Sequence, residues 1–159
     1  MNSGFAAWLL ALGIGVVAGL RTFTAPAAVA WAAYIGWINL HGSALAFMGS
    51  VWAVAIFTIL AMVEFVVDQL PTTPPRTAPA GLSARIVTGA LCGASLAIAG
   101  AASPSIGAVA GAIGGIAGAF GGKAARIGLV RALRVPDFAI AIPEDLLAIG
   151  LGLFLASRF

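Results

Sequence analysis

The sequence predicts an all-α fold, a polytopic bundle of five to six transmembrane helices in one integral membrane domain over residues 1–159. Of the 159 residues, 62% are hydrophobic and only 8% are charged, whereas about a quarter of the residues of a soluble domain are charged. A soluble domain of this size still exposes roughly 30% of its unfolded surface to water, and the chain has too few polar side chains to cover that surface. Lipid is therefore the expected solvent.

The apolar segments set the expected helices. The first tract, 5–40, would measure roughly 54 Å as one helix, against about 30 Å for the hydrocarbon core of a bilayer. Gly19 and Pro26 offer a break, so we expect two helices, 5–20 and 24–40, or five spans in total if the first piece is re-entrant. Four further segments have about the 20 apolar residues that a span needs: 49–70, 82–102, 106–133 and 138–157.

A proline-rich segment divides the chain. Residues 71–79 read PTTPPRTAP, which excludes a helix and predicts a stiff extended linker. It separates two halves, 1–70 and 80–159, of three helices each. An odd number of helices makes the second half enter the membrane in the opposite sense, as in the 3+3 inverted repeats, here with a broken first helix, that recur in transporters.

Basic residues gather on one side of the predicted topology. Six of the eight lie there: Arg76, Arg85, Lys123, Arg126, Arg131 and Arg134. The positive-inside rule makes this side cytoplasmic, and Arg21 joins it if 5–20 and 24–40 form a hairpin. The uncharged loop 40–48 lies opposite, bracketed by Trp31, Trp37 and Trp52 as in an interfacial aromatic belt. We expect a multi-pass protein of a bacterial inner (plasma) membrane.

Glycines recur every four residues in the segment 106–133. Two ridges result, one of Gly107, Gly111 and Gly115 and one of Gly114, Gly118 and Gly122. Lipid gives helices no hydrophobic reason to associate, so close approach over small residues supplies packing energy. The pattern places this helix at the bundle centre or at the seam of a homo-oligomer. Relief of crowding within one chain fits equally well.

Four of the five carboxylates fall within predicted helices. Glu64 and Asp68 are four residues apart on one helix face, and Glu144 and Asp145 are adjacent in the last helix. An ionised carboxylate in a span costs about 2.5 to 3.5 kcal/mol on insertion scales. All four are expected at similar depth, so they could converge on one site that holds a counter-charge.

Three kinds of counter-charge would neutralise these four carboxylates, and the sequence does not choose among them. Arginines of the chain, with Arg21, Arg76 and Arg126 nearest in predicted depth, would form structural ion pairs. Protons would neutralise carboxyl groups whose pKa burial has raised. A hard cation such as Mg²⁺, Ca²⁺ or Mn²⁺ would take oxygen ligands. Pro143 either restarts or kinks its helix beside the second acid pair, or it lies in the first helical turns, and Asp137 is expected to cap that helix.

Three motifs resemble an uncharacterised family of small bacterial membrane proteins that share a domain of unknown function. They are GLRTF at 19–23, EFVVDQLP at 64–71 with PRT following, and PEDLLAIG at 143–150. The resemblance implies that Glu64, Asp68, Pro71, Glu144 and Asp145 are positions of interest, and it implies no established activity. The chain has TTPP after Pro71, where the family has acidic and aromatic residues.

These patterns lead to a hypothesis and an alternative. The hypothesis is a small transporter or channel in which Glu64, Asp68, Glu144 and Asp145 bind a cation or protons while Arg21 and Arg126 balance the charge. The alternative is a non-transporting subunit or scaffold, with internally paired acids, that associates through the glycine ridges: Gly107, Gly111, Gly115, Gly118 and Gly122.

The expected partners follow from the same patterns. They are membrane lipid and a second copy of the chain, and the substrate stays open. No cofactor is expected beyond a bound cation. Nucleic acid is not expected, because the basic residues form no stripe on a polar face. An enzyme is not expected, because neither an activated nucleophile nor a phosphate-binding loop is visible.

Overall fold

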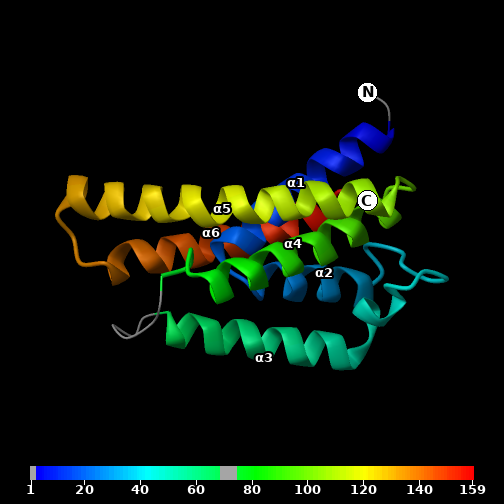
Figure 1. Ribbon diagram of the computed structural model, residues 1–159. Helices are drawn as coiled ribbons and strands as arrows, with labels where there is room; N and C mark the ends of the chain where they lie inside the picture. The colour runs from blue at the N-terminus through cyan, green and yellow to red at the C-terminus, as the bar shows by residue number, and fades with distance from the viewer. Residues whose placement is uncertain (1–2, 69–74) are drawn as a thin grey trace.

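The computed structural model describes residues 3–68 and 75–159. Within these ranges the chain forms six α-helices and one short 3₁₀ helix, without a strand, and successive helices run in alternating directions (Figure 1). The helices are α1 (Ser3–Leu20), α2 (Thr24–Tyr34), η1 (Ala46–Gly49), α3 (Val51–Val67), α4 (Pro79–Ala99), α5 (Pro104–Leu133) and α6 (Phe138–Ala156). The predicted all-α fold is confirmed.

The length and apolar composition of its helices identify the chain as a membrane protein. The helices α4, α5 and α6 are long and apolar enough to cross a bilayer, and α1 and α3 are shorter apolar helices. Because lipid replaces water around them, many large apolar side chains stay exposed, such as Ile59 of α3 and Leu146 of α6.

The helix α2 is shorter than the predicted helix 24–40. Its 11 residues would rise only roughly 16 Å. The chain leaves the helix at Ile35 and turns at Gly36, whose φ of +82° is a left-handed conformation that glycine adopts without steric cost. Ile38 and Leu40 are then buried in the core. This stretch is therefore apolar because it packs as a loop, and the predicted helical end is wrong.

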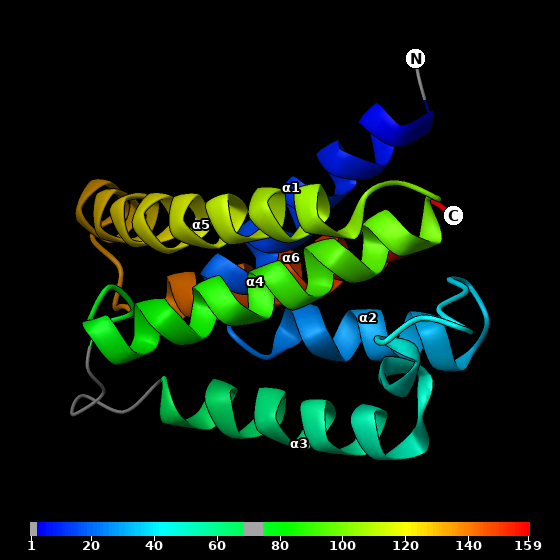
Figure 2. The same cartoon turned by 45° about the vertical axis from the view of Figure 1, so that its right-hand side comes forward.

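Glycines let α5 lie against both α1 and α4 (Figure 2). One ridge, Gly107, Gly111 and Gly115, faces α4, where an added methyl group would collide with the backbone of Gly89, Gly93 or Arg85. In the other ridge, Gly114 and Gly118 meet the backbone of α1 around Val16. Of the two predicted positions for this helix, the bundle centre is the one that the structure shows. Helices of the same chain cover both ridges, so neither ridge presents a free surface to a second copy.

The two halves agree in direction and differ in detail. The first helix of each half, α1 and α4, runs in opposite senses (Figure 1). However, α2 has 11 residues and packs at the side against α3 and α6, whereas its counterpart α5 has 30 and occupies the centre. The reversal of direction fits an inverted repeat, and the unequal helices do not. The division into half-repeats 1–70 and 80–159 stays a prediction.

The linker is described only from Pro75 onward. Residues 69–74, which include most of the predicted connector, lie outside the described residues. In the described part, the backbone N–H of Ala78 donates to the carbonyl oxygen of Pro75 at 2.8 Å, which closes a turn. Pro79 is the first residue of α4, a position where its missing N–H costs nothing. The predicted extended conformation is therefore wrong for 75–79.

Candidate functional site

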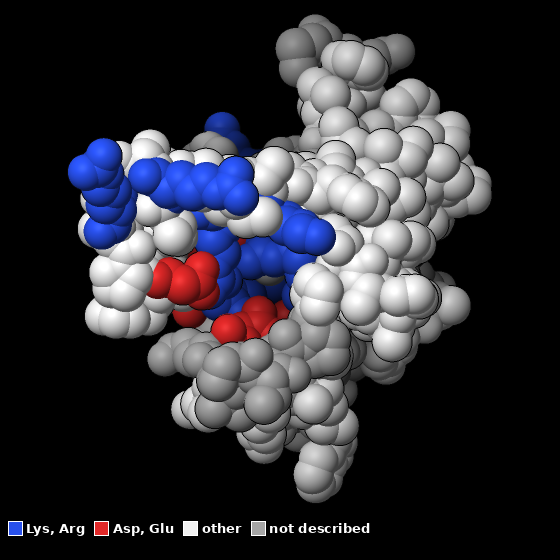
Figure 3. Space-filling model, turned by 60° about the vertical axis from the view of Figure 1, so that its left-hand side comes forward, with Lys and Arg blue, Asp and Glu red and all other residues white. Residues whose placement is uncertain are grey.

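Charged side chains gather at the end of the bundle where α3 and α5 finish and α4 and α6 begin. In Figure 3, which turns this end toward the viewer, acidic and basic side chains gather around one hollow. All five carboxylates of the chain bind arginines here. We call these residues the charge cluster: Arg21, Glu64, Asp68, Arg76, Arg85, Arg126, Asp137, Glu144 and Asp145. It includes all four carboxylates of the predicted site.

Arg21 lies at the centre of the charge cluster. Its side chain is fully buried in the turn between α1 and α2, next to the C-terminal end of α1, where the helix dipole favours a cation. Its Nε donates to Oδ1 of Asp145 at 2.6 Å, and its Nη1 donates to Oδ2 of Asp68. The guanidinium also lies 5.5 Å from the ring centroid of Phe65. One cation thus joins the end of α3 to α6.

Glu64 binds backbone groups as well as an arginine. Its carboxylate oxygens accept the N–H groups of Thr22 at 2.7 Å and Phe23 at 2.9 Å, at the positive N-terminal end of α2. Nη2 of Arg85 lies 3.6 Å from Oε1 of Glu64, and Nε of Arg85 donates to the carbonyl oxygen of Gly19 at 3.2 Å. These contacts fix the turn that carries Arg21.

Glu144 is held by two other arginines. Arg76 donates to it with both Nη atoms, at 2.6 and 3.1 Å, and Nη1 of Arg126 lies at 3.6 Å. Adjacent residues on a helix project about 100° apart, so Glu144 and Asp145 reach different arginines. The predicted balancing role is therefore divided: Arg21 serves Asp68 and Asp145, while Arg76 is the main partner of Glu144.

Two predictions for the start of α6 are settled by its geometry. The helix runs unbroken from Phe138 to Ala156 with Pro143 inside it, so the alternative in which a helix starts again at Pro143 is wrong. Asp137 occupies the N-cap position, but its side chain makes no capping hydrogen bond. It accepts Nε of Arg126 at 2.8 Å instead, because a charge-assisted bond to a guanidinium is stronger than one to a neutral N–H.

We expect the Asp137–Arg126 ion pair to stabilise the fold slightly and to be lost in acid. The hydrogen bond from Arg126 lowers the pKa of Asp137 below its ordinary value of 3.8. A carboxyl whose folded pKa is depressed stabilises the protein above its unfolded pKa, and this contribution disappears as pH falls through the folded pKa. Because 64% of the Asp137 side chain is exposed, the effect should stay below about 1 kcal/mol.

The variant Asp137→Asn tests this pair. Thermal unfolding in detergent should show a smaller drop in Tm between about pH 5 and pH 3 for the variant than for the natural chain. An equal drop in both proteins would contradict the assignment.

The arrangement leaves the four predicted carboxylates paired within the chain. In the described residues, no three His, Cys, Asp or Glu side chains are grouped so that they could hold a metal ion. Arg85 is a site residue that the sequence prediction does not include, since it appears there only among the basic residues of one side. Its signal was present, since an arginine inside the predicted span 82–102 needs an internal partner. The backbone contribution of Thr22 and Phe23 has no sequence signal.

Fold and site together define an all-helical membrane protein whose charged end is closed by internal ion pairs. Over residues 8–157, the sequence matches the family model described as domain of unknown function (DUF4126), and the chain belongs to this family. The predicted membership of an uncharacterised domain family is thereby confirmed. No curated protein and no solved structure is significantly similar to the chain.

Proposed function

We propose that this protein is a non-transporting membrane subunit or scaffold, in which the charge cluster is a permanent structural clamp. A single observation carries the proposal: each of the four carboxylates within or next to the spans is bound by an arginine of the same chain. The counter-charge that such carboxylates need is therefore built in.

A transported cation would have to displace these arginines. Arg21 is fully buried, and Asp68 and Asp145 both bind it, so a cation that took its place would leave a buried guanidinium without its partners. Removing one partner of a buried ion pair typically costs about 3 to 5 kcal/mol. A cation that comes and goes would meet this cost in every cycle, which favours the structural role over the transport hypothesis.

The clamp also explains how the peripheral helices are held. In the described residues, α3 packs mainly on the short α2 and on η1, and α6 makes few contacts with the central α5. Ion pairs join the ends of these helices to the centre: Asp68 of α3 and Asp145 of α6 bind Arg21, and Glu144 lies beside Arg126 of α5. Lipid supplies no hydrophobic force to bring these helices together.

A partner of such a subunit would use a surface other than the glycine ridges, which α1 and α4 cover. One such surface is an apolar groove of about 400 Å³ between α2, α3 and α6, lined among others by Trp31, Met62 and Leu153. The hydroxyl of Thr24 is buried at this groove and has no hydrogen-bond partner within the part of the chain that the structure describes. It could accept or donate one bond to a polar group of an apolar partner helix.

Flux and stability measurements on the same variants distinguish the clamp from a transport site. In liposomes, the natural chain should carry no proton, Mg²⁺, Ca²⁺ or Mn²⁺ flux above that of protein-free vesicles. Glu144→Gln and Asp145→Asn should each lower the stability in detergent, because a hydrogen bond to a charged group contributes about 1.5 to 3 kcal/mol. Asp137→Asn, whose carboxylate is exposed, is the matched control and should change stability much less.

The opposite pattern would overturn the proposal. Cation-dependent flux by the natural chain, abolished by Glu144→Gln or Asp145→Asn without a loss of thermal stability, would identify these carboxylates as a transport site.

A further inference from the structure

The apolar groove between α2, α3 and α6 has the size of a small-ligand site. Its volume of about 400 Å³ falls within the roughly 300 to 1,000 Å³ that is usual for such sites. The aromatic rings of Trp31, Trp37 and Phe65 line it, and a flat ring packs well against other aromatic rings. Of the described residues that line the groove, none belongs to the charge cluster. A fitting ligand is therefore uncharged and has a flat, largely apolar body.

Two threonines of the groove wall have hydroxyl groups with unused hydrogen-bonding capacity. The Thr58 hydroxyl accepts the Nε1–H of Trp31 at 3.1 Å, and its own O–H has no acceptor among the described residues. Thr24 is only 4% exposed, and its hydroxyl has no partner in the same part of the chain. In α4, by contrast, Thr88 and Ser95 donate to carbonyl oxygens of their own helix. The groove therefore offers two O–H donors to a ligand.

The depth of Thr58 limits which molecules can reach it. Thr58 is the eighth of the 17 residues of α3, so it lies roughly 10 to 14 Å along the axis from either end of the helix. A phospholipid cannot bring its ester oxygens to the middle of the hydrocarbon core, because its headgroup stays in the interfacial layer. The oxygen that meets Thr58 therefore belongs to a neutral molecule that dissolves in the core.

An oxygen that only accepts hydrogen bonds suits this position best. An alcohol or an amide brings a donor of its own, and this donor would need a further acceptor where water is absent. A ring carbonyl accepts the O–H of Thr58 and adds no donor. Quinones combine such carbonyl groups with a flat, uncharged ring that is soluble in hydrocarbon.

We infer that this groove binds the ring of a lipid-soluble quinone. One carbonyl oxygen accepts the O–H of Thr58, and the ring packs beside the indole of Trp31. Thr24, nearer to the charge cluster, offers a second donor. The inference concerns binding alone, with no transfer of electrons, and it does not rest on the proposed clamp. A partner helix is the competing occupant of the groove, and ligand binding by the isolated chain separates the two.

Duroquinone and durene test the carbonyl contact. Both are benzene rings with four methyl groups, and only duroquinone has the two carbonyl oxygens. Thermal unfolding of the purified chain in detergent, followed by circular dichroism at increasing ligand concentration, gives the affinity of each. Duroquinone should raise Tm to a plateau and bind more tightly than durene.

Variants of Thr58 assign this difference to one hydroxyl. Thr58→Val should weaken duroquinone binding by about two- to tenfold, the usual contribution of one hydrogen bond, and should leave the affinity for durene unchanged. Thr58→Ser keeps the hydroxyl and should retain the natural affinity. Thr88→Val is the matched control, because the Thr88 hydroxyl bonds within α4, and it should also bind as the natural chain does.

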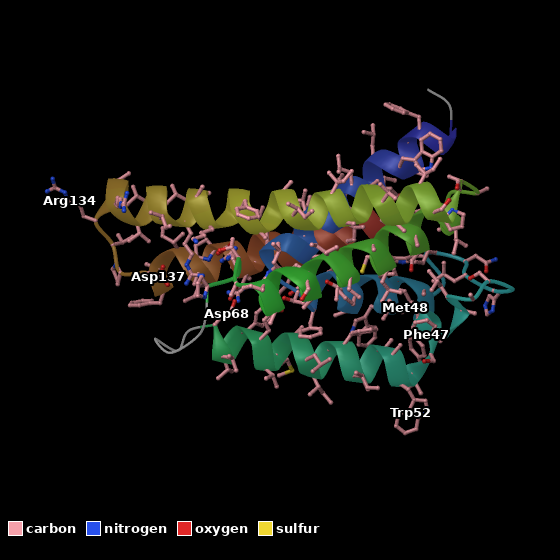
Figure 4. All side chains as sticks on the ribbon, in the orientation of Figure 1. Phe47, Met48, Trp52, Asp68, Arg134 and Asp137 are labelled. Carbon is pink, nitrogen blue, oxygen red and sulfur yellow. The ribbon has the colours of Figure 1, made fainter. Side chains whose placement is uncertain are left out.

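The walls of the groove are tested by two matched pairs. Trp31→Leu should weaken the binding of both ligands, whereas Trp52→Leu should not, because Trp52 points away from the bundle (Figure 4) and is 75% exposed. Ala27→Phe fills the groove and should abolish binding, and Ala55→Phe, on the exposed face of α3 outside the groove, should not.

Three results would overturn the inference. They are no saturable rise in Tm with duroquinone, equal affinities of the natural chain for duroquinone and durene, or an unchanged affinity for duroquinone in Thr58→Val. Failure here would leave the flux and stability results for Glu144→Gln and Asp145→Asn unaffected, since neither residue lines this groove.

Discussion

Replacing Arg21 with methionine is expected to lower the free energy of unfolding by about 3 to 5 kcal/mol. The change removes a charge while keeping most of the side-chain length. It leaves Asp68 and Asp145 without their main cation, facing each other across the buried position that Arg21 fills. Uncompensated carboxylates at low dielectric are costly to keep ionised. Unfolding in mild detergent, followed by circular dichroism during titration with a denaturing detergent, measures the loss.

Two further variants show that charge, and not shape, is responsible. Arg131→Met removes an exposed arginine of α5 and should have almost no effect on the free energy of unfolding. The triple variant Arg21→Met, Asp68→Leu and Asp145→Leu should recover much of the lost stability, because well-packed apolar residues can replace a buried ionic group at little or no cost. If Arg21→Met alone were as stable as the natural chain, the central position of Arg21 in the fold would be refuted.

Gly111→Leu is expected to prevent α5 from packing between α1 and α4. A side chain at this position would collide with the backbone of Gly89 and Gly93 on α4. On α1, Gly15 also approaches the backbone of Gly111 closely. Overpacking typically costs about 1 to 3 kcal/mol, and more where the backbone itself is the obstacle. We expect the variant to aggregate or to elute as a heterogeneous species in size-exclusion chromatography.

Alanine substitutions test the same contact by whether they raise or lower Tm. In an unobstructed helix, replacing glycine with alanine stabilises by about 1 kcal/mol. At Gly128, also in α5, an added methyl group would meet no atom of another described segment within 4 Å, so Gly128→Ala should raise Tm. Gly111→Ala should lower it despite the same gain in helix propensity. Parallel shifts in Tm for both variants would rule out the close approach of α4 to α5.

Helix positions could be predicted well because hydropathy and length limit where spans can lie. For α5, the predicted and observed helices end at the same residue, Leu133. The prediction failed at 35–40, where Ile38 and Leu40 are apolar because they fill the core as part of a loop. Hydropathy records that a residue avoids water, and it does not record whether the residue does so in a helix.

The sequence was enough to predict which residues form the candidate site, but not which arginine pairs with which acid. The cost of ionised groups at low dielectric was enough to single out the four carboxylates and Arg21. The partner of each acid depends on side-chain directions that spacing does not fix. Arg126 was expected to balance the intramembrane acids, yet its closest partner is the exposed Asp137. Glu64 binds backbone N–H groups, which every residue except proline possesses and which no sequence pattern marks.

The ion pair between Arg21 and Asp145 spans 124 positions of the chain, and this separation has a consequence for biogenesis. A ribosome makes Arg21 early, whereas Asp145 emerges only with α6. During the intervening synthesis, the insertion machinery has to hold a nascent chain that contains Arg21 with only Asp68 available, and Arg76 without its later partner. Shielding of these groups by water or by an insertase would therefore be needed until the sixth helix arrives.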